Sequence, residues 1–235
     1  MIRRWSTALI CTLTVLSGGV IAAAPAAAAG CADIEVFWAR GTAEPGAPIG
    51  YTGLAFVEAL RAQTPGRSLR ARGVRYAASD DFRNRAVIAE TVNDGVKTAQ
   101  KDITTTAARC PRSRIVLGGF SQGAVVAGYA LVDKLAIPSQ YQQYARYAPA
   151  PLPADVTRHL VAAVMFGAPS KRFIRDAGAP PITIGARFRP MTASYCAPGD
   201  SICDGAPIGA PSAPHAYYPF NGTPALAASF VVRRL

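Results

Sequence analysis

Histidine, cysteine and acidic side chains are scarce in this chain of 235 residues. It has two histidines and five cysteines, and its 25 lysines and arginines outnumber 14 aspartates and glutamates. It has no CxxC pair and no Cys/His cluster, so we expect neither a metal nor another cofactor. It also lacks a dense basic run with interleaved aromatics, so the net charge of +11 does not indicate a nucleic-acid partner. We interpret the charge as a solvated, arginine-rich surface that allows peripheral contact with lipid or cell wall.

A long uninterrupted apolar run is absent as well. Residues 8–21 are mostly apolar after a basic start, but Ser17-Gly18-Gly19 interrupts them, and a membrane anchor needs about 20 apolar residues. Small residues follow and end in Ala27-Ala28-Ala29, which is typical of a signal-peptidase site. We therefore expect residues 1–29 to be a secretory signal peptide and the protein to be extracellular or cell-wall associated. A lipid-modified Cys31 is the alternative.

Residues 30–235 then form one domain, which is long enough for a substantial core. Apolar runs predict strands at 34–38, 69–76, 114–118, 161–166 and 191–195. Helices are predicted at 52–63, from Asn84 to just before Pro111, at 122–135 and from Thr223 onward. Strands that alternate with helices predict an α/β fold with a central, mainly parallel five-stranded sheet covered on both faces.

Four cysteines remain once Cys11 is assigned to the signal peptide. Disulfides are typical of exported chains, and four cysteines allow three pairings. Cys196 and Cys203 are seven residues apart and suit a short loop closed by its own bridge. Cys31 and Cys110 would then pair and tie the start of the domain to the segment before a strand.

One serine lies in a motif with a chemical meaning. Gly119-Phe120-Ser121-Gln122-Gly123 follows a predicted buried strand and precedes a predicted helix. A G-x-S-x-G run in that context is a nucleophile elbow, and ligands bind beyond the carboxyl ends of the strands in such sheets. A serine hydroxyl needs a base to become nucleophilic, so a histidine must reach Ser121.

The two histidines make this requirement a sharp test. His159 precedes the fourth predicted strand, at the amino end of the sheet, and we expect it to be an exposed loop residue. His215 follows the last predicted strand on the carboxyl side and fits the chain order Ser, Asp, His.

An acid that orients the base should lie between Ser121 and His215. The candidates by order are Asp133, Asp155, Asp176, Asp200 and Asp204. Asp200 is favoured because it directly follows the fifth strand, inside the loop that Cys196 and Cys203 would pin.

Acyl transfer also requires donors for the developing oxyanion. The backbone N–H of Gln122 is one candidate, because it belongs to the residue after the nucleophile. The other is Thr42, in the Arg40-Gly41-Thr42 loop after the first strand. A plain turn at the strand end is the alternative reading of that loop.

Several segments of the chain together resemble the cutinase family, particularly the cutinase-like esterases of mycobacteria and their relatives. They are Ala39-Arg40-Gly41-Thr42, Gly119-Phe120-Ser121-Gln122-Gly123, Cys196-Ala197-Pro198-Gly199-Asp200-Ser201-Ile202-Cys203 and His215-Ala216-Tyr217-Tyr218. The resemblance extends from Cys31 to the end of the chain. It implies a compact α/β-hydrolase, a three-layer sandwich with a Ser121–His215–Asp200 triad and an oxyanion hole at Thr42 and Gln122. It also implies the disulfides Cys31–Cys110 and Cys196–Cys203.

The chain departs from the fungal members of that family at one point near the oxyanion loop. Fungal cutinases carry an asparagine there, whereas residues 76–82 offer none at that spacing. The expected activity is hydrolysis of carboxylic esters of short to medium acyl chains through an acyl-enzyme, by a secreted monomer. The alternatives are a lipase or phospholipase acting at lipid interfaces, and a non-catalytic surface protein on a hydrolase scaffold.

Overall fold

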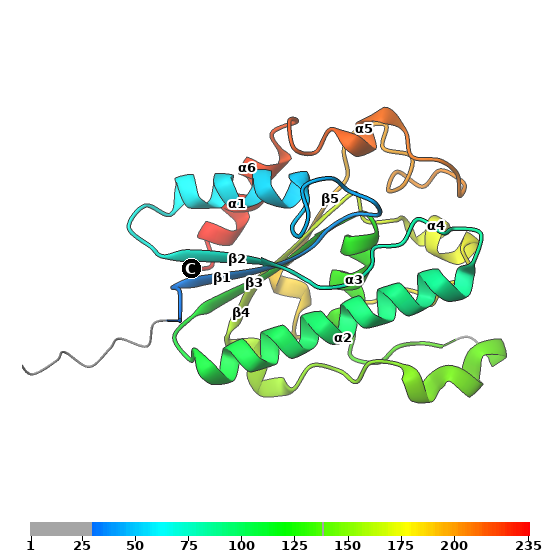
Figure 1. Cartoon of the computed structure of the whole chain (residues 1–235), viewed down its shortest axis with the longest axis horizontal. Helices are drawn as coiled ribbons and strands as arrows, with labels where there is room; N and C mark the ends of the chain where they lie inside the picture. Colours follow the sequence, from blue (N-terminus) through cyan, green and yellow to red (C-terminus); the bar gives the residue numbers. More distant parts are fainter. Residues whose placement is uncertain (1–29, 138) are drawn as a thin grey trace, which may run out of the picture. The chain divides into compact units, whose positions relative to one another are not determined.

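A computed structural model describes residues 30–137 and 139–235, and the expected signal peptide at residues 1–29 lies outside them. Five strands form one sheet in the order β2-β1-β3-β4-β5, and every neighbouring pair is parallel (Figure 1). The strands are β1 (Ile34–Ala39), β2 (Leu69–Gly73), β3 (Arg114–Phe120), β4 (Leu160–Phe166) and β5 (Thr192–Tyr195). The α-helices are α1 (Tyr51–Gln63), α2 (Arg85–Arg109), α3 (Gln122–Ala130), α4 (Lys171–Asp176), α5 (Ala213–Ala216) and α6 (Thr223–Val232). Three 3₁₀ helices are also present: η1 (Ser139–Tyr147), η2 (Ala154–Arg158) and η3 (Arg189–Met191).

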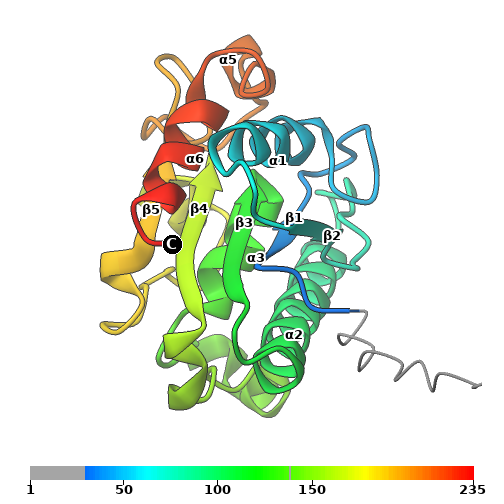
Figure 2. The ribbon, with the colours of Figure 1, turned by 90° about the vertical axis from the view of Figure 1, so that its left-hand side faces the viewer.

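The sheet is covered on both faces. In β1, Phe37 packs into the cluster that contains α2 and α3, while Val36 and Trp38 pack into the cluster with α1 and α6. Figures 1 and 2 show the two helix pairs on opposite faces. Strands buried on both faces are mostly apolar, which explains the apolar runs in the sequence, and the one charge in β1, Glu35, is paired with Arg70 and Arg72. The predicted three-layer α/β sandwich is confirmed.

Two predicted elements are longer than the observed ones. The strand predicted at 69–76 ends at Gly73, where β2 pairs with Trp38 near the end of β1. The helix predicted at 122–135 ends at Ala130. The carbonyl of Leu131 accepts a hydrogen bond from the Gly185 amide, and residue 132 forms an antiparallel bridge to residue 184. These tertiary contacts occupy the groups that a longer helix would need.

Both disulfides are the ones that the spacing favours, Cys31–Cys110 and Cys196–Cys203. The sulfur of Cys31 is therefore engaged, whereas lipid modification would need it free. Among residues 30–137 and 139–235, no helix combines the length and the apolar character of a membrane span.

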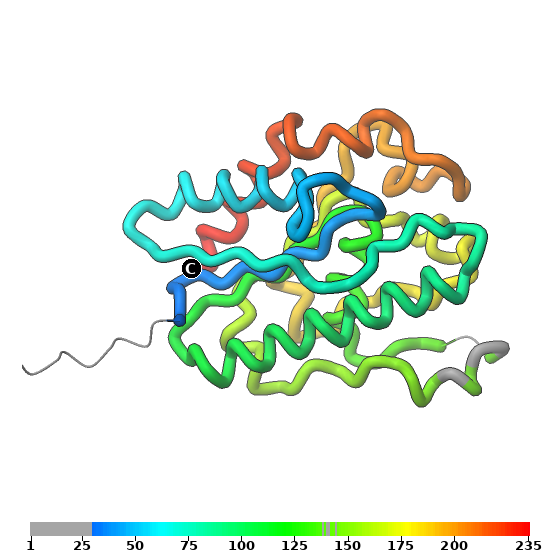
Figure 3. The backbone as a smooth tube through the Cα atoms, in the orientation of Figure 1, coloured from blue at the N-terminus to red at the C-terminus, as the bar shows by residue number. Residues whose placement is uncertain are grey.

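The parallel register aligns the carboxyl ends of four strands. Ala39 pairs with Gly119, Phe120 pairs with Phe166, and Phe166 pairs with Tyr195. The loops that follow these residues consequently leave the sheet at one edge. Figure 3 shows the loop after β1 and the segment at residues 200–216 at that same end of the sheet.

Candidate active site

Ser121 occupies the sharp turn between β3 and α3. Its backbone has φ 53° and ψ −118°, a conformation that non-glycine residues rarely adopt. The Ser121 amide donates to the carbonyl of Phe166 at 2.9 Å, which anchors the turn to β4. A Cβ on Gly123 would lie 1.9 Å from the carbonyl oxygen of Ala39, so only glycine lets α3 approach the end of β1. This is the geometry of a nucleophile elbow.

His215 lies in the short helix α5 and reaches Ser121. Its Nε2 is 2.9 Å from the Ser121 hydroxyl oxygen. The imidazole is almost fully buried, and it packs on the Phe120 ring with the two ring centres 4.8 Å apart. Phe120 precedes the serine, so the same elbow that presents the hydroxyl also supports the histidine ring.

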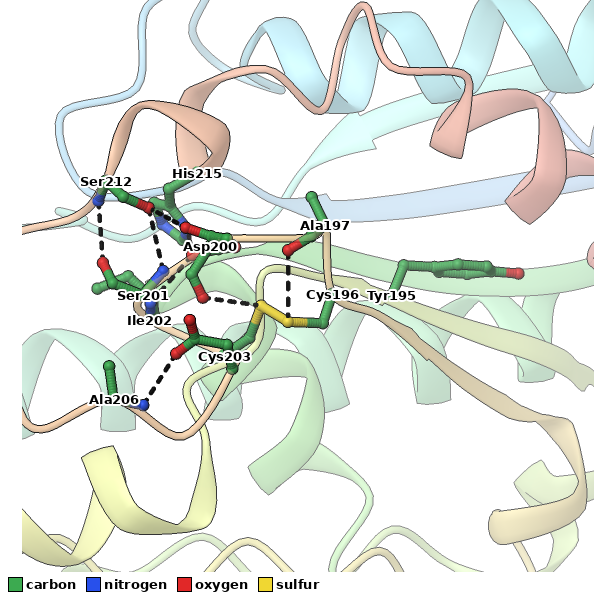
Figure 4. Close-up of a disulfide and its surroundings, with 12 residues drawn as sticks. Tyr195, Cys196, Ala197, Asp200, Ser201, Ile202, Cys203, Ala206, Ser212 and His215 are labelled. Carbon is green, nitrogen blue, oxygen red and sulfur yellow. Dashed lines mark hydrogen bonds and ion pairs between the residues drawn. A yellow bond between two sulfur atoms is a disulfide. The ribbon is translucent and has the colours of Figure 1, made fainter.

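Asp200 lies on the other side of the His215 ring, in the loop closed by Cys196 and Cys203 (Figure 4). Both carboxylate oxygens are 2.9 Å from His215 Nδ1. An ionised carboxylate can only accept hydrogen bonds, so Nδ1 carries the proton and donates. In a neutral ring this leaves Nε2 free to accept the proton of the Ser121 hydroxyl.

The surroundings keep Asp200 ionised although it has no exposed surface. Burial is the largest single influence and would raise its pKa, but hydrogen bonds from His215, Tyr218 and the Ile202 amide outweigh it. The pKa of Asp200 therefore lies below its usual value. The Tyr218 hydroxyl donates to Oδ2 at 2.7 Å, and burial raises the pKa of that phenol, which keeps it protonated.

The other histidine is buried, which corrects the expectation of an exposed loop residue. His159 is 7% exposed and lies at the amino end of β4. Its Nε2 accepts a hydrogen bond from Arg158 Nε at 3.0 Å. It lies at the amino ends of the strands, whereas Ser121 lies at their carboxyl ends, as its place before β4 predicts. Among the other acids, Asp133 pairs with Arg187 and accepts from the Ala186 amide.

The two expected oxyanion donors lie on neighbouring elements, the first turn of α3 and the loop after β1. Gln122 opens α3, and the first amides of a helix have no acceptor inside it. Thr42 follows β1, and the position of Gly123 against the carbonyls of Ala39 and Arg40 keeps this loop beside the elbow. Within residues 30–137 and 139–235, no acceptor pairs with the amide of Thr42 or of Gln122. Both N–H groups are thus available to a ligand.

The family model for cutinase matches residues 30–235. The chain belongs to the cutinase family. It is 42% identical to the probable carboxylesterase Culp7 of Mycobacterium tuberculosis, over 74% of this chain and 88% of that protein. It is 37% identical to phospholipase Culp4 of the same species, over 85% of this chain and 83% of that protein. As a cutinase-family member the chain is a carboxylic ester hydrolase, which confirms the expected enzyme class.

Solved structures agree with the cutinase fold. The Trichoderma reesei cutinase bound to a phosphonate inhibitor is 29% identical and has a TM-score of 0.61, over 86% of this chain and 76% of that one. The catalytic core of acetyl xylan esterase from the same fungus is 22% identical with a TM-score of 0.66, over 88% of this chain and 100% of that one. The predicted compact α/β-hydrolase is therefore confirmed.

In this cutinase-family chain, the loop that carries Thr42 is supported without the fungal asparagine. The Tyr76 hydroxyl donates to the carbonyl of Arg40, and the Arg40 guanidinium donates to the carbonyl of Ala77 at 2.8 Å. The Ala43 amide donates to the carbonyl of Ala78 at 3.2 Å. Two side-chain donors and one main-chain amide therefore join the two loops on both sides of Thr42.

Sequence reasoning missed three supporting side chains. Gln122 donates from its side chain to the carbonyl of Ser79 at 3.0 Å and ties the elbow to the 76–82 loop. Glu44 accepts from the amides of Gly41 and Thr52 at 2.7 and 2.8 Å and folds the loop after β1 back onto α1. The third is Tyr218, three residues after His215. In the sequence, Tyr218 stood out only as part of the His215-Ala216-Tyr217-Tyr218 segment. That segment does not show that its hydroxyl contacts Asp200.

Within the described part of the chain, no group of three or more His, Cys, Asp or Glu side chains is arranged to hold a metal ion.

Proposed function

We propose that this protein is a secreted serine esterase that hydrolyses short to medium acyl esters through an acyl-enzyme on Ser121. The observation that carries the proposal is the chain of contacts from Ser121 Oγ to His215 Nε2 and from His215 Nδ1 to Asp200, each at 2.9 Å. A hydroxyl, a base and an orienting acid in this order are the elements of a serine hydrolase triad.

In the first half-reaction, Ser121 Oγ attacks the ester carbonyl carbon and His215 Nε2 takes the hydroxyl proton. Asp200 stabilises the imidazolium that forms. The negative charge on the carbonyl oxygen is received by the amides of Thr42 and Gln122, each worth roughly 3–4 kcal/mol by analogy with other oxyanion donors. His215 then gives its proton to the leaving alkoxide, the C–O ester bond breaks, and the alcohol departs.

In the second half-reaction, His215 removes a proton from water, and the resulting hydroxide attacks the acyl-enzyme carbonyl carbon. Collapse of this intermediate releases the carboxylic acid and returns the proton to Ser121 Oγ. The residues needed are the same in both halves, so loss of any one should arrest turnover.

The test combines p-nitrophenyl butyrate turnover with labelling by a fluorophosphonate, which reacts only with an activated serine. We expect Ser121→Ala and His215→Gln to lower kcat by about 10⁴-fold or more and to abolish labelling. His159→Gln is the matched control and should keep both, because His159 lies at the opposite edge of the sheet. Labelling that persists in Ser121→Ala would exclude Ser121 as the nucleophile.

The acyl preference rests on the open surroundings of the serine. Ser121 is partly exposed, and we assign to its rim two large apolar side chains, Phe82 and Ile208, which are 64% and 49% exposed. An open apolar rim offers contact to a few methylene groups but cannot enclose a long chain. A series of p-nitrophenyl esters from acetate to palmitate should give the highest kcat/KM at intermediate chain lengths.

A phospholipase or lipase is the second candidate. The segment after His215 presents two large apolar side chains to solvent, Phe220 at 81% and Leu226 at 63% exposure. The similarity to phospholipase Culp4 is in keeping with this surface. An interfacial enzyme should show a rate that rises steeply above the critical micelle concentration of its substrate, and Phe220→Ser should flatten that rise. A rate that ignores the micelle transition would count against this candidate.

We further propose that residues 1–29 are removed on export, and that residues 30–235 act as a monomer in contact with lipid or cell wall. N-terminal sequencing of the exported protein should begin near residue 30. Light scattering of the purified protein should give the mass of one chain.

A further inference from the structure

Three arginines and a histidine surround a cavity at the amino edge of the sheet. The cavity has a volume of about 500 Å³ and is lined by Pro111, Arg112, Ser113, Arg114, Arg158 and His159. We call it the arginine pocket. Its volume is within the ordinary range for small-ligand sites. No step of the ester chemistry uses these residues.

Two turns are fixed side by side to form this pocket. The turn between α2 and β3 carries Arg112, β3 begins at Arg114, and η2 ends at Arg158. The Ile115 amide donates to the carbonyl of His159 at 2.8 Å, which joins the two turns. The first turn is also pinned by the disulfide at Cys110, the residue directly before Pro111.

Buried polar contacts make the floor of the pocket rigid. Ser113 is 3% exposed, and its hydroxyl donates to the carbonyl of Ala32. The Arg114 amide donates to the carbonyl of Asp33 at 2.8 Å. The positions of the arginine backbones are thus set before any ligand arrives, which lowers the entropic cost of binding.

The positive charges in the pocket are not neutralised by ion pairs. Within residues 30–137 and 139–235, none of Arg112, Arg114 and Arg158 forms a salt bridge. His159 accepts from Arg158 Nε and so orients that guanidinium. Burial, and then the charges of Arg158 and Arg114, lower the pKa of His159, while Asp155 acts in the opposite direction. The lining of the cavity therefore carries three guanidinium charges, and the carboxylates of Asp33 and Asp155 act on it from nearby.

We propose that the arginine pocket binds a phosphate group, carried either by a small soluble phosphate ester or by a phospholipid headgroup. Guanidinium groups are planar forks of donors that match phosphate oxygens in pairs. Three guanidinium groups that form no direct ion pair favour a dianion over a single carboxylate.

The pocket is separate from the esterase site. Arg114 begins β3 and Phe120, the residue before Ser121, ends it, so the two are six residue steps apart (120 − 114 = 6). At roughly 3.3 Å per residue the separation is about 20 Å. This exceeds the Debye length of about 8 Å at physiological ionic strength, so occupancy should not alter the ester chemistry. A lipid surface bound here would leave the carboxyl edge of the sheet facing away from it.

The test uses inorganic phosphate as the probe, titrated into the purified protein at low ionic strength. Binding is followed by calorimetry and by the NMR signals of the His159 ring. We expect saturable binding that Arg114→Gln and Arg158→Gln each weaken by about tenfold. Arg83→Gln removes the same charge from an exposed position between β2 and α2 and should leave the affinity unchanged. Absence of saturable binding, or equal weakening in Arg83→Gln, would overturn the proposal.

Two further measurements separate the sources of the phosphate and guard against misfolding. The first is cosedimentation with vesicles of phosphatidylglycerol in phosphatidylcholine. A phospholipid headgroup is supported if the protein cosediments, if Arg114→Gln does not, and if phosphate competes with the vesicles. Phosphate binding without cosedimentation supports a soluble ester. Arg158→Lys keeps the charge without the fork, so its affinity should lie between those of the wild type and Arg158→Gln. An affinity for Arg158→Lys below that of Arg158→Gln would contradict recognition by charge.

Discussion

At the scale of single residues, the position of Asp200 depends on a tyrosine outside the proposed triad. Tyr218 is fully buried and stacks on Phe166, with ring centres 5.8 Å apart and planes inclined by 17°. Its hydroxyl accepts from the Ala197 amide at 2.8 Å and donates to Asp200 Oδ2 at 2.7 Å. The carboxylate therefore faces His215 with its second oxygen already satisfied, which stabilises its ionised form.

Replacing Tyr218 by Phe should lower kcat for p-nitrophenyl butyrate by about tenfold, because a hydrogen bond to a charged group is worth roughly 1.5–3 kcal/mol. The pKa of Asp200 should rise, since this bond is one of the causes that hold it down. Tyr217→Phe is the control, because that neighbouring tyrosine is 57% exposed. An unchanged kcat in Tyr218→Phe, or an equal fall in both variants, would remove Tyr218 from this role.

At the scale of elements, the two disulfides act at opposite edges of the sheet. Cys196–Cys203 closes a loop of sequence separation 7 that contains Asp200, after β5. Cys31–Cys110 spans a separation of 79 and joins the segments that precede β1 and β3. The first bridge fixes a candidate catalytic side chain, and the second closes a long loop far from it.

Each bridge can be removed by a double Cys→Ser substitution. We expect the loss of Cys31–Cys110 to reduce stability more, and the loss of Cys196–Cys203 to reduce kcat more. The chain-entropy model predicts a loss of about 4–5 kcal/mol in the free energy of unfolding for the long loop and about 2–3 kcal/mol for the short one. The short bridge should cost more in kcat, since Asp200 would lose its fixed position. Urea denaturation and ester turnover measure the two effects. If one bridge proved more important for both stability and kcat, the two bridges would not have these separate roles.

At the scale of the whole molecule, the parallel sheet separates two chemical environments. The carboxyl edge holds Ser121, Asp200 and His215, and the amino edge holds the arginine pocket with His159. Burial holds the pKa of His159 below its usual value of about 6.5, and the adjacent arginines act in the same direction. The folded state then binds fewer protons at His159 than the unfolded state, so acidification favours unfolding.

The free energy of unfolding should consequently fall as the pH drops from 7 to 5. Asp200 also has a lowered pKa, but its contribution is lost only below the unfolded value of about 3.9 and so lies outside this window. In His159→Gln the urea midpoint should depend less on pH between 7 and 5, because glutamine keeps an acceptor for Arg158 but does not titrate. A slope that stays unchanged in this variant would assign the effect to other groups.

The sequence alone determined the layered fold and narrowed the site to a few residues. Buried parallel strands are mostly apolar, so β1, β3 and β4 are visible as short apolar runs. With only two histidines, the chain order left His215 as the single candidate base on the carboxyl side. Apolar runs and the order of residues along the chain can be recognised without knowing which distant residues touch.

Only the tertiary structure decided which groups support these residues. Tyr218 meets Asp200, Tyr76 meets the Arg40 carbonyl, and the end of α3 is set by Gly185. The basic turns at Arg114 and Arg158 are 44 residues apart in sequence and become neighbours only when β3 and β4 pair. Such contacts depend on strand register and packing, which follow from burial across the whole domain and leave no periodic trace in the sequence.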